Sequence, residues 1–371
     1  MRLVIAGGGT GGHVYPALSV LQSRTQRPTL LWIGTGGGLE QPLVERAGIP
    51  FVGISAGGLR GLGPGTVARN SLRLARGFVQ AWRWLRTFQA DVVFATGGYV
   101  TVPVGLAAWL QRRPLLIELP DLEPGLAIKA LAPLANAVVV SAEPTAAHFA
   151  AGKAIVTGYP VRPELAHPKP KAVARTTFDI GRDERLLLVT GGSQGAHSLN
   201  RAVAASVAAL TEIGHVIHVH GRSDGQWLQA QRAALPTEQQ GRYHLFDYLH
   251  AEMVDALVAA DLVVARAGAS ALGEFPAAHL PAILVPYPYS GAHQWANATF
   301  LAERGAAVTV ADDRLATELV PLVQSLLGDE QRLDAMRRTM AGLARPDAAE
   351  RIFELLQGLA TSVTASQQAH S

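Results

Sequence analysis

The chain has 371 residues, of which 49% are hydrophobic and 16% charged, and its formal net charge is +3. This length exceeds one ordinary hydrophobic core and therefore predicts two domains. The absence of cysteine excludes disulfides, thiolate catalysis and cysteine-ligated metals, and no apolar run approaches the roughly 18 residues of a membrane-spanning helix. We expect a globular cytoplasmic protein without a secretory signal, and the positive charge permits anionic partners.

A glycine-rich turn follows the first apolar run. Val4-Ile5-Ala6 leads into Gly7-Gly8-Gly9-Thr10-Gly11-Gly12-His13, and helix-forming residues come next. Glycines permit positive φ and let backbone amides approach a ligand, while a helix N-terminus attracts anions. The stretch predicts strand, turn and helix with an anionic group at the turn; a turn that is merely tight is the alternative.

The spacing of Gly7, Gly9 and Gly12 also fits a dinucleotide fingerprint, which requires a carboxylate near the end of the second strand. That predicted strand, 30–33, runs into further glycines at 34–38, and the first acidic residue is Glu40 on the next predicted helix. This arrangement disfavours a nicotinamide cofactor, and we expect no cofactor.

Short apolar runs alternate with stretches long enough for helices, which predicts parallel sheets covered on both faces. The first group of strands is predicted at 3–6, 30–33, 92–95, 115–117 and 137–140, and the second at 186–190, 216–219, 262–265 and 282–285. The stiff, turn-rich segment 157–164, followed by Pro168 and Pro170, separates the groups and predicts a boundary at 160/161. The last residues, 361–371, are polar and are predicted to be disordered.

The stretch 60–86 interleaves arginines with aromatic and aliphatic side chains. Arg73, Arg76, Phe78, Trp82 and Arg83 are its candidate membrane contacts. Guanidinium groups can meet lipid phosphates while apolar side chains enter the interface. A helix with one core face and a solvated basic flank is the alternative, and nucleic acid is disfavoured because apolar bulk fills the gaps between the arginines.

The second half repeats the strand–turn–helix pattern twice. The turn at 191–196 follows one strand, and the small residues 268–271 follow another, where a diphosphate could approach a helix N-terminus. Glu274, one turn into the predicted helix, suits hydrogen bonds from both ribose hydroxyls; dipole complementation is the alternative. His293 and Gln294 lie at a loop–helix junction suited to holding sugar hydroxyls. His215, His218 and His220 are predicted to be structural rather than metal ligands.

Seven ordered motifs resemble those of the MurG family, whose members are peripheral membrane enzymes that add N-acetylglucosamine to lipid I to form lipid II for peptidoglycan. The resemblance spans residues 1 to about 359. The motifs lie at 8–14, at 55–61 with its Gly58-Leu59-Arg60-Gly61 end, at 96–100, 158–162, 191–196 and 266–269, and at His293-Gln294 with Asn297-Ala298.

The resemblance implies a GT-B fold, in which two Rossmann-like domains face each other across a cleft. Residues 1–160 with the C-terminal helix 347–360 would form the acceptor domain, and 161–346 the sugar-nucleotide domain. The enzyme would be an inverting, metal-independent hexosyltransferase that uses UDP-N-acetylglucosamine and lipid I on the cytoplasmic face of the plasma membrane. The implied UDP-N-acetylglucosamine contacts are Thr10, Gly11, Gly12, Asp121, Arg162, Ser193, Ala269, Ser270, Ala271, Leu272, Gly273, Glu274 and Gln294, and the implied acceptor contacts are Gly98 and Tyr99.

His13 falls at or near the position proposed for the family's general base, with Asp121 and Glu118 as rivals. A hydrogen bond to the acceptor diphosphate, or capping of the helix, is the alternative role of His13. The chain departs from the family where His-Glu-Gln-Asn is usual, because it has Glu118-Leu119-Pro120-Asp121. Asp121 keeps acceptor oxygens but loses two N–H donors and adds a negative charge near a diphosphate. Ala267 stands where the family often has serine. Another GT-B sugar-nucleotide enzyme, such as a lipid glycosyltransferase or a 2-epimerase, and a non-catalytic nucleotide- and membrane-binding scaffold are the alternative functions.

Overall fold

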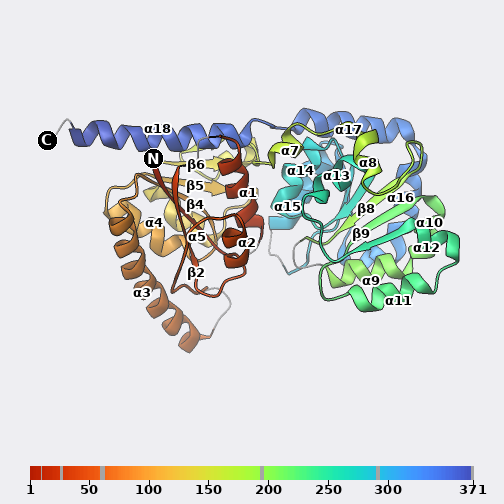
Figure 1. Cartoon of the computed structure of the whole chain (residues 1–371), viewed down its shortest axis with the longest axis horizontal. Helices are drawn as coiled ribbons and strands as arrows, with labels where there is room; N and C mark the ends of the chain where they lie inside the picture. Colours follow the sequence, from red (N-terminus) through yellow and green to blue (C-terminus); the bar gives the residue numbers. More distant parts are fainter. Residues whose placement is uncertain (10, 26–27, 59–62, 193–195, 290–292, 369–371) are drawn as a thin grey trace. The chain divides into compact units, whose positions relative to one another are not determined.

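The computed structural model describes residues 1–9, 11–25, 28–58, 63–192, 196–289 and 293–368. Contacts within the chain divide it into two compact units (Figure 1). The first unit comprises Met1–Pro163 and Asp347–Ser371, and the second comprises Glu164–Pro346. Each unit contains one parallel sheet of the Rossmann type, so the prediction of two Rossmann-like domains is confirmed.

In the first unit, the described strands form a sheet in the order β3-β2-β1-β4-β5-β6-β7. The strands are β1 (Arg2–Gly7), β2 (Thr29–Thr35), β3 (Phe51–Ile54), β4 (Val92–Gly97), β5 (Leu115–Leu119), β6 (Ala137–Val140) and β7 (Ala154–Val156). The helices are α1 (Gly11–Gln22), α2 (Gln41–Arg46), α3 (Pro64–Phe88), α4 (Thr101–Leu110), α5 (Leu126–Leu131), η1 (Ala132–Leu134), α6 (Glu143–Ala146) and α18 (Ala348–Gln368).

Alternation along the buried strands sends side chains to two cores, one on each face of this sheet. Helices α1, α2 and α18 cover one face through residues such as Val14, Val44 and Phe353, and α3, α4 and α5 cover the other through Leu85, Val104 and others. Helix α18 therefore returns to the first unit and packs beside α1 (Figure 1). It extends to Gln368, beyond the predicted helix end at 360.

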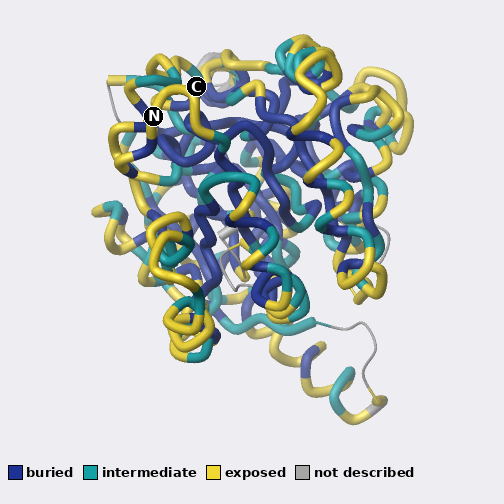
Figure 2. Tube along the Cα trace, turned by 90° about the vertical axis from the view of Figure 1, so that its right-hand side faces the viewer, coloured by how far each residue is buried: buried dark blue, intermediate teal, exposed yellow. Residues whose placement is uncertain are grey.

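In the second unit, the described strands form a sheet in the order β10-β9-β8-β11-β12-β13. The strands are β8 (Leu186–Thr190), β9 (His215–Val219), β10 (Tyr243–Phe246), β11 (Leu262–Ala265), β12 (Ala282–Leu284) and β13 (Ala307–Thr309). The helices are α7 (Pro163–Ala166), α8 (Lys171–Thr176), α9 (His197–Ala205), α10 (Val207–Ile213), α11 (Gly225–Ala233), α12 (Thr237–Arg242), α13 (Glu252–Ala259), η2 (Ala269–Leu272), α14 (Glu274–Ala277), α15 (His293–Glu303), η3 (Asp312–Arg314), α16 (Leu315–Gly328) and α17 (Glu330–Leu343). Figure 2 shows the inner parts of the Cα trace as mostly buried and its outer coils as exposed.

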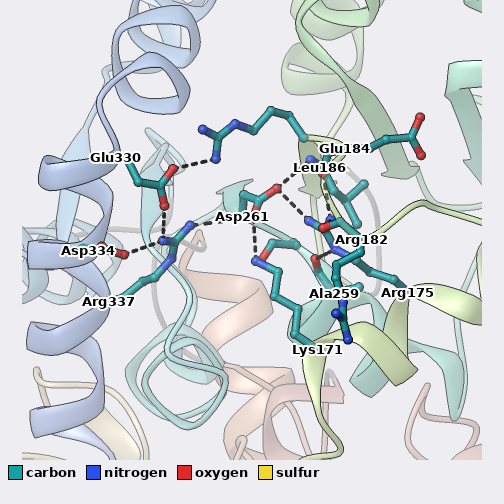
Figure 3. A network of polar contacts seen from close by, with 12 residues as sticks. Lys171, Arg175, Arg182, Glu184, Leu186, Ala259, Asp261, Glu330, Asp334 and Arg337 are labelled. Carbon is teal, nitrogen blue, oxygen red and sulfur yellow. Dashed lines mark hydrogen bonds and ion pairs between the residues drawn. The ribbon is translucent and has the colours of Figure 1, made fainter.

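A buried polar cluster lies at the amino ends of the central strands β8 and β11 of the second sheet (Figure 3). Asp261 is 5% exposed and accepts hydrogen bonds from Leu186 N at 2.8 Å, Arg175 Nη2 at 2.9 Å and Lys171 Nζ at 2.5 Å. Arg175 also donates to the carbonyl oxygens of Gly181, Arg182, Glu184 and Ala259. The cluster lies at the amino ends of the strands, so we assign it to the stability of the fold.

Candidate functional site

The strand order of the first sheet reverses between β1 and β4, and ligands of open α/β sheets bind beyond the carboxyl ends of strands at such a point. The turn after β1 contains Gly9 at φ +102°, and the turn after β4 contains Gly97 and Gly98 at +125° and +83°. Gly8 N donates to Gly97 O at 3.2 Å, and a Cβ on Gly98 would collide with Gly8 O. The two turns therefore pack backbone against backbone.

His13 lies in the first turn of α1, between these two turns. Its Nδ1 is 2.9 Å from Thr96 O, and Thr96 Oγ1 donates to His13 O at 2.8 Å. A Cβ on Gly97 would collide with the imidazole, so glycine is required at that position to accommodate the ring. Because a carbonyl oxygen only accepts hydrogen bonds, Nδ1 carries the proton and Nε2 keeps the lone pair that can accept another.

The electrostatic surroundings of His13 favour a neutral imidazole. Burial lowers the pKa of His13 below 6.5, and the negative charges of Asp121 and Glu40 and the hydrogen bond to Thr96 partly oppose this effect. The same two carboxylates stabilise the imidazolium that forms when Nε2 takes up a proton. The group is therefore suited to act as a base at neutral pH.

Glu118 and Asp121, the other two candidates for the general base, differ from His13 in their surroundings. Glu118, on β5, is buried without a hydrogen-bond partner among the described residues, and burial raises its pKa to about 8. It is therefore mostly protonated at neutral pH and poorly suited to accept a proton. Asp121 follows β5, is half-buried and acts electrostatically on His13.

In the second unit the strand order reverses between β8 and β11, and the predicted sugar-nucleotide turns follow these two strands. The Arg266 guanidinium, 8% exposed, links them, because Nη1 lies 2.5 Å from Asp312 Oδ1 and Nη2 donates to Ser198 Oγ at 2.6 Å. Ser198 Oγ in turn donates to Asp312 Oδ1 at 2.9 Å. The sequence did not point to Asp312, which lies far from the glycine-rich motifs.

Two amide side chains form hydrogen bonds to the loops that follow β11 and β12. Asn297, fully buried on α15, donates to Ala267 O at 3.0 Å, and Gln294 Oε1 accepts from Tyr287 N at 2.8 Å. Glu274 begins α14 and is half-buried. The structure thus brings Glu274, the turn 268–271 and Gln294 to one edge of the second unit.

The helix predicted after β11 is shorter than expected. The structure has the 3-10 turn η2 through Ala269, Ser270, Ala271 and Leu272, then Gly273 at φ −126°, and only then the four residues of α14. Gly273 breaks the helical geometry, so Glu274 is the first residue of a short helix rather than a residue one turn in.

The other predicted site residues are distributed as follows. Thr10 and Ser193 lie outside the described residues, whereas Gly11 and Gly12 open α1. Arg162 stacks over the Tyr15 ring with its guanidinium carbon 5.8 Å from the centroid, and both belong to the first unit. Tyr99 is 53% exposed beside Gly58.

The two histidines of β9 and His220, which follows this strand, have structural partners. His218 is fully buried, with Nδ1 2.7 Å from Tyr243 Oη and Nε2 3.0 Å from Asn200 Oδ1. Burial lowers the pKa of His218 to about 3. His215 packs against His244, and His220 Nδ1 lies 2.6 Å from Gly221 O. Across the part of the chain that the structure describes, no three histidine or acidic side chains gather as a metal site.

Helix α3 presents a basic and apolar outer stripe. Arg69, Leu72, Arg73, Arg76, Val79 and Arg83 are exposed, and their spacing places them on one side, opposite the buried Asn70, Gly77, Ala81 and Leu85. Phe78 and Trp82, the predicted apolar membrane contacts, are half-buried and pack against the core. The end of α4 adds exposed Leu106, Trp109 and Leu110, and Gln111 Nε2 donates to Trp82 O at 3.0 Å. No described helix is both long and apolar enough to cross a bilayer.

Comparison with known proteins agrees with this architecture. Residues 3–140 match the glycosyltransferase family 28 N-terminal domain, and residues 186–352 match its C-terminal domain. A UDP-N-acetylglucosamine–N-acetylmuramyl-(pentapeptide) pyrophosphoryl-undecaprenol N-acetylglucosamine transferase of Roseiflexus sp. is 41% identical, over 97% of this chain and 95% of its own. The relative of the same name from Desulforudis audaxviator is 40% identical, over 97% and 99%.

Solved structures extend the likeness. The crystal structure of Acinetobacter baumannii MurG superposes with a TM-score of 0.77 at 28% identity, covering 96% of this chain and 99% of its own. UDP-GlcNAc 2-epimerase from Neisseria meningitidis has a TM-score of 0.67 at 14% identity, covering 96% and 100%, which shows a shared fold. The fold and the two turn-lined sheet edges define a GT-B glycosyltransferase of family 28. Within that class, the chain belongs to the MurG family of UDP-N-acetylglucosamine-dependent transferases.

Proposed function

We propose that the protein transfers N-acetylglucosamine from UDP-N-acetylglucosamine to the 4-hydroxyl of the muramoyl sugar of lipid I, giving lipid II. The main support is near-full-length identity to relatives named for this transfer. The geometry agrees with this function. The neutral His13 imidazole lies at the carboxyl ends of the strands of the first sheet, and the loops around Glu274 lie at the carboxyl ends of the strands of the second.

The reaction is a single displacement that inverts the anomeric carbon. The acceptor oxygen attacks C1 of the sugar, the bond from C1 to the diphosphate oxygen breaks, and UDP leaves. Nε2 of His13 accepts the hydroxyl proton as the new bond forms. Backbone amides of the turn at 268–271 stabilise the charge that develops on the diphosphate.

The test is an incubation of purified protein with labelled UDP-N-acetylglucosamine and a lipid I analogue. We expect labelled lipid II, with UDP released in equal amount. Formation of a 2-epimer or of another glycolipid would identify a different sugar-nucleotide enzyme on the same fold. UDP binding without any product would identify a nucleotide-binding scaffold.

Substitution of Glu274 by Gln tests the donor site. The amide keeps one acceptor oxygen but loses a charge-assisted hydrogen bond to the ribose, which is worth about 1.5–3 kcal/mol. We expect the KM for UDP-N-acetylglucosamine to rise roughly 10- to 100-fold with a smaller change in kcat. A calorimetric titration with UDP that gives the wild-type Kd would exclude the ribose contact.

We further propose that the first unit docks on an anionic membrane at the cytoplasmic face. The docking surface consists of the exposed α3 stripe, Trp84 and Arg86 of α3, and the exposed apolar end of α4. Leu72 is 73% exposed and Trp109 is 47% exposed, and both are flanked by arginines or by the Arg112-Arg113 pair. Trp82, Arg83, Arg86 and Thr87 line an open surface hollow of about 480 Å³, where the two guanidinium groups would meet lipid phosphates.

The double substitution Arg73→Glu with Arg83→Glu tests this surface. A basic residue near an anionic bilayer contributes about 1 kcal/mol, so removing two arginines weakens vesicle binding roughly 30-fold, and the added negative charges weaken it further. We expect slower transfer to vesicle-borne lipid I and unchanged transfer to a short-tailed soluble analogue. Arg332→Glu with Arg338→Glu, on exposed positions of α17, is the matched control. Equal vesicle co-sedimentation of the two double variants would contradict the proposal.

A further inference from the structure

The carboxylate of Glu40 is fully buried between the two glycine-rich turns of the first unit. Its Oε2 accepts a hydrogen bond from Gly9 N at 3.1 Å, and its Oε1 accepts one from Thr35 N at 2.6 Å. Glu40 also stands at the N-cap of α2, and its backbone carbonyl accepts from Val44 N. One side chain thus joins the turn after β1 to the turn after β2.

Glycines form the walls around this carboxylate. A Cβ on Gly8 would lie 2.8 Å from Glu40 Oε1, one on Gly34 would lie 3.0 Å from it, and one on Gly38 would collide with the carboxylate. Gly38, after β2, therefore leaves the space that the Glu40 carboxylate occupies, and Gly34 within β2 leaves space for both Glu40 and Phe51. The carboxylate thus accounts for two of the glycines at a place where a dinucleotide fingerprint would need an acidic residue.

Burial of a carboxylate is costly unless hydrogen bonds or a counter-charge compensate it. Within the described residues, no arginine or lysine forms an ion pair with Glu40, and the two backbone amides are its hydrogen-bond donors. An apolar side chain in the same space would leave both amides without this acceptor. The arrangement instead holds the Gly9 amide in one direction.

The turn that Glu40 holds leads directly into α1. Gly9 has φ +102°, α1 begins at Gly11, and His13 is its third residue. From the opposite side, Gly97 O accepts from Gly8 N, and Thr96 O is bonded to His13 Nδ1. The Gly7–Gly9 segment is therefore hydrogen-bonded on one side to Glu40 and on the other to the turn after β4. These contacts fix the backbone that leads into α1.

We propose that Glu40 is a positioning residue for glycosyl transfer: its carboxylate fixes the Gly8-Gly9 turn so that α1 presents the His13 imidazole to the acceptor hydroxyl. The inference rests on the proposed function, because it assigns Glu40 to the transfer step. It predicts an effect on kcat rather than on the Kd for UDP, because Glu274 and the turn at 268–271, which we propose to bind the nucleotide, belong to the second unit.

The experiment compares Glu40→Gln with the wild-type protein. Glutamine has the same shape, but its amide nitrogen must face either the Gly9 or the Thr35 N–H, so one of the two hydrogen bonds is lost. A displacement of about 1 Å at a reacting group lowers rates by up to about 100-fold, so we expect kcat to fall roughly 10- to 100-fold. The Kd for UDP should stay within twofold of wild type.

The matched control is Glu45→Gln, which removes the same charge from an exposed position of α2. It should change neither constant. Glu40→Asp, which keeps the charge but is too short to reach both amides, is the second variant and is used if Glu40→Gln is unfolded at the assay temperature. Folding is followed by near-UV circular dichroism.

Each outcome of these measurements either supports or overturns the positioning role of Glu40. A selective fall in kcat in a folded variant supports the proposal. Unchanged kcat, an equal loss of UDP affinity, or unfolding of both variants overturns it, the last because Glu40 would then serve the fold alone. Wild-type protein that binds UDP but makes no lipid II would refute the proposed function instead, and this result is seen before any variant is measured.

Discussion

Substitution of His13 by Ala is expected to lower kcat roughly 100- to 10,000-fold, the range that a well-placed general base contributes. The hydrogen bond from Nδ1 to Thr96 O fixes the ring, and burial lowers its pKa, so Nε2 carries a lone pair at neutral pH. The Kd for UDP should be nearly unchanged, because Glu274 and the turn at 268–271, the proposed nucleotide contacts, belong to the second unit. Single-turnover transfer to a soluble lipid I analogue measures the chemical step directly.

Asp121→Asn is the comparison for this prediction. It removes a charge that raises the pKa of His13 and restores the amide usual in the family, so we expect a smaller loss of kcat. A larger loss in Asp121→Asn than in His13→Ala would identify Asp121 as the base. A collapse of UDP binding in His13→Ala would assign the histidine to substrate binding or to structure.

The pH dependence follows from the direction of the same shift. A base works only when it is unprotonated, and the pKa of His13 is lowered from 6.5, so the acid-side decline of kcat/KM should be centred below pH 6.5. Removing the Asp121 charge should move this decline further toward acid. A decline centred well above pH 6.5 would show that another group controls the reaction.

Substitution of Asp261 by Ala is expected to destabilise the second unit by about 3–5 kcal/mol, the cost of removing one partner from a buried ion pair. The Arg175 guanidinium, 4% exposed, would lose its counter-charge, and Leu186 N would lose its acceptor (Figure 3). Lys171 Nζ would keep only the Ala260 carbonyl among its described partners. Urea unfolding monitored by circular dichroism measures the loss.

Asp334→Ala is the matched control for charge. Its carboxylate is 49% exposed and pairs with Arg337 Nη1 at 2.6 Å, so its loss should cost less than about 1 kcal/mol. Asp261→Ala should retain its kcat at temperatures where it is folded, because the cluster lies at the strand starts and the site at the strand ends. A destabilisation no larger than that of Asp334→Ala would contradict the buried-pair argument.

The central strands could be predicted from the sequence, and the edge strands could not. The nine predicted strands all occur, whereas β3, β7, β10 and β13 were missed, and these four lie at the edges of the two sheets. Central parallel strands are buried on both faces and are continuously apolar, as in β6 and β8. Edge strands are short and partly exposed, as in β7, where all three residues are half-buried, so their pattern is weak.

The sequence by itself determined the two-sheet plan, the family and the positions of the ligand-facing turns, because glycine-rich strand–helix junctions are local features. Only the tertiary structure decided how those turns are held. Glu40 and Asp312 make their contacts with residues far away in the chain, at Gly9 and Arg266. The sequence showed Glu40 only as an acid in the wrong place for a ribose, because its hydrogen bonds exist only once β1 and β2 pair and bring their two turns together.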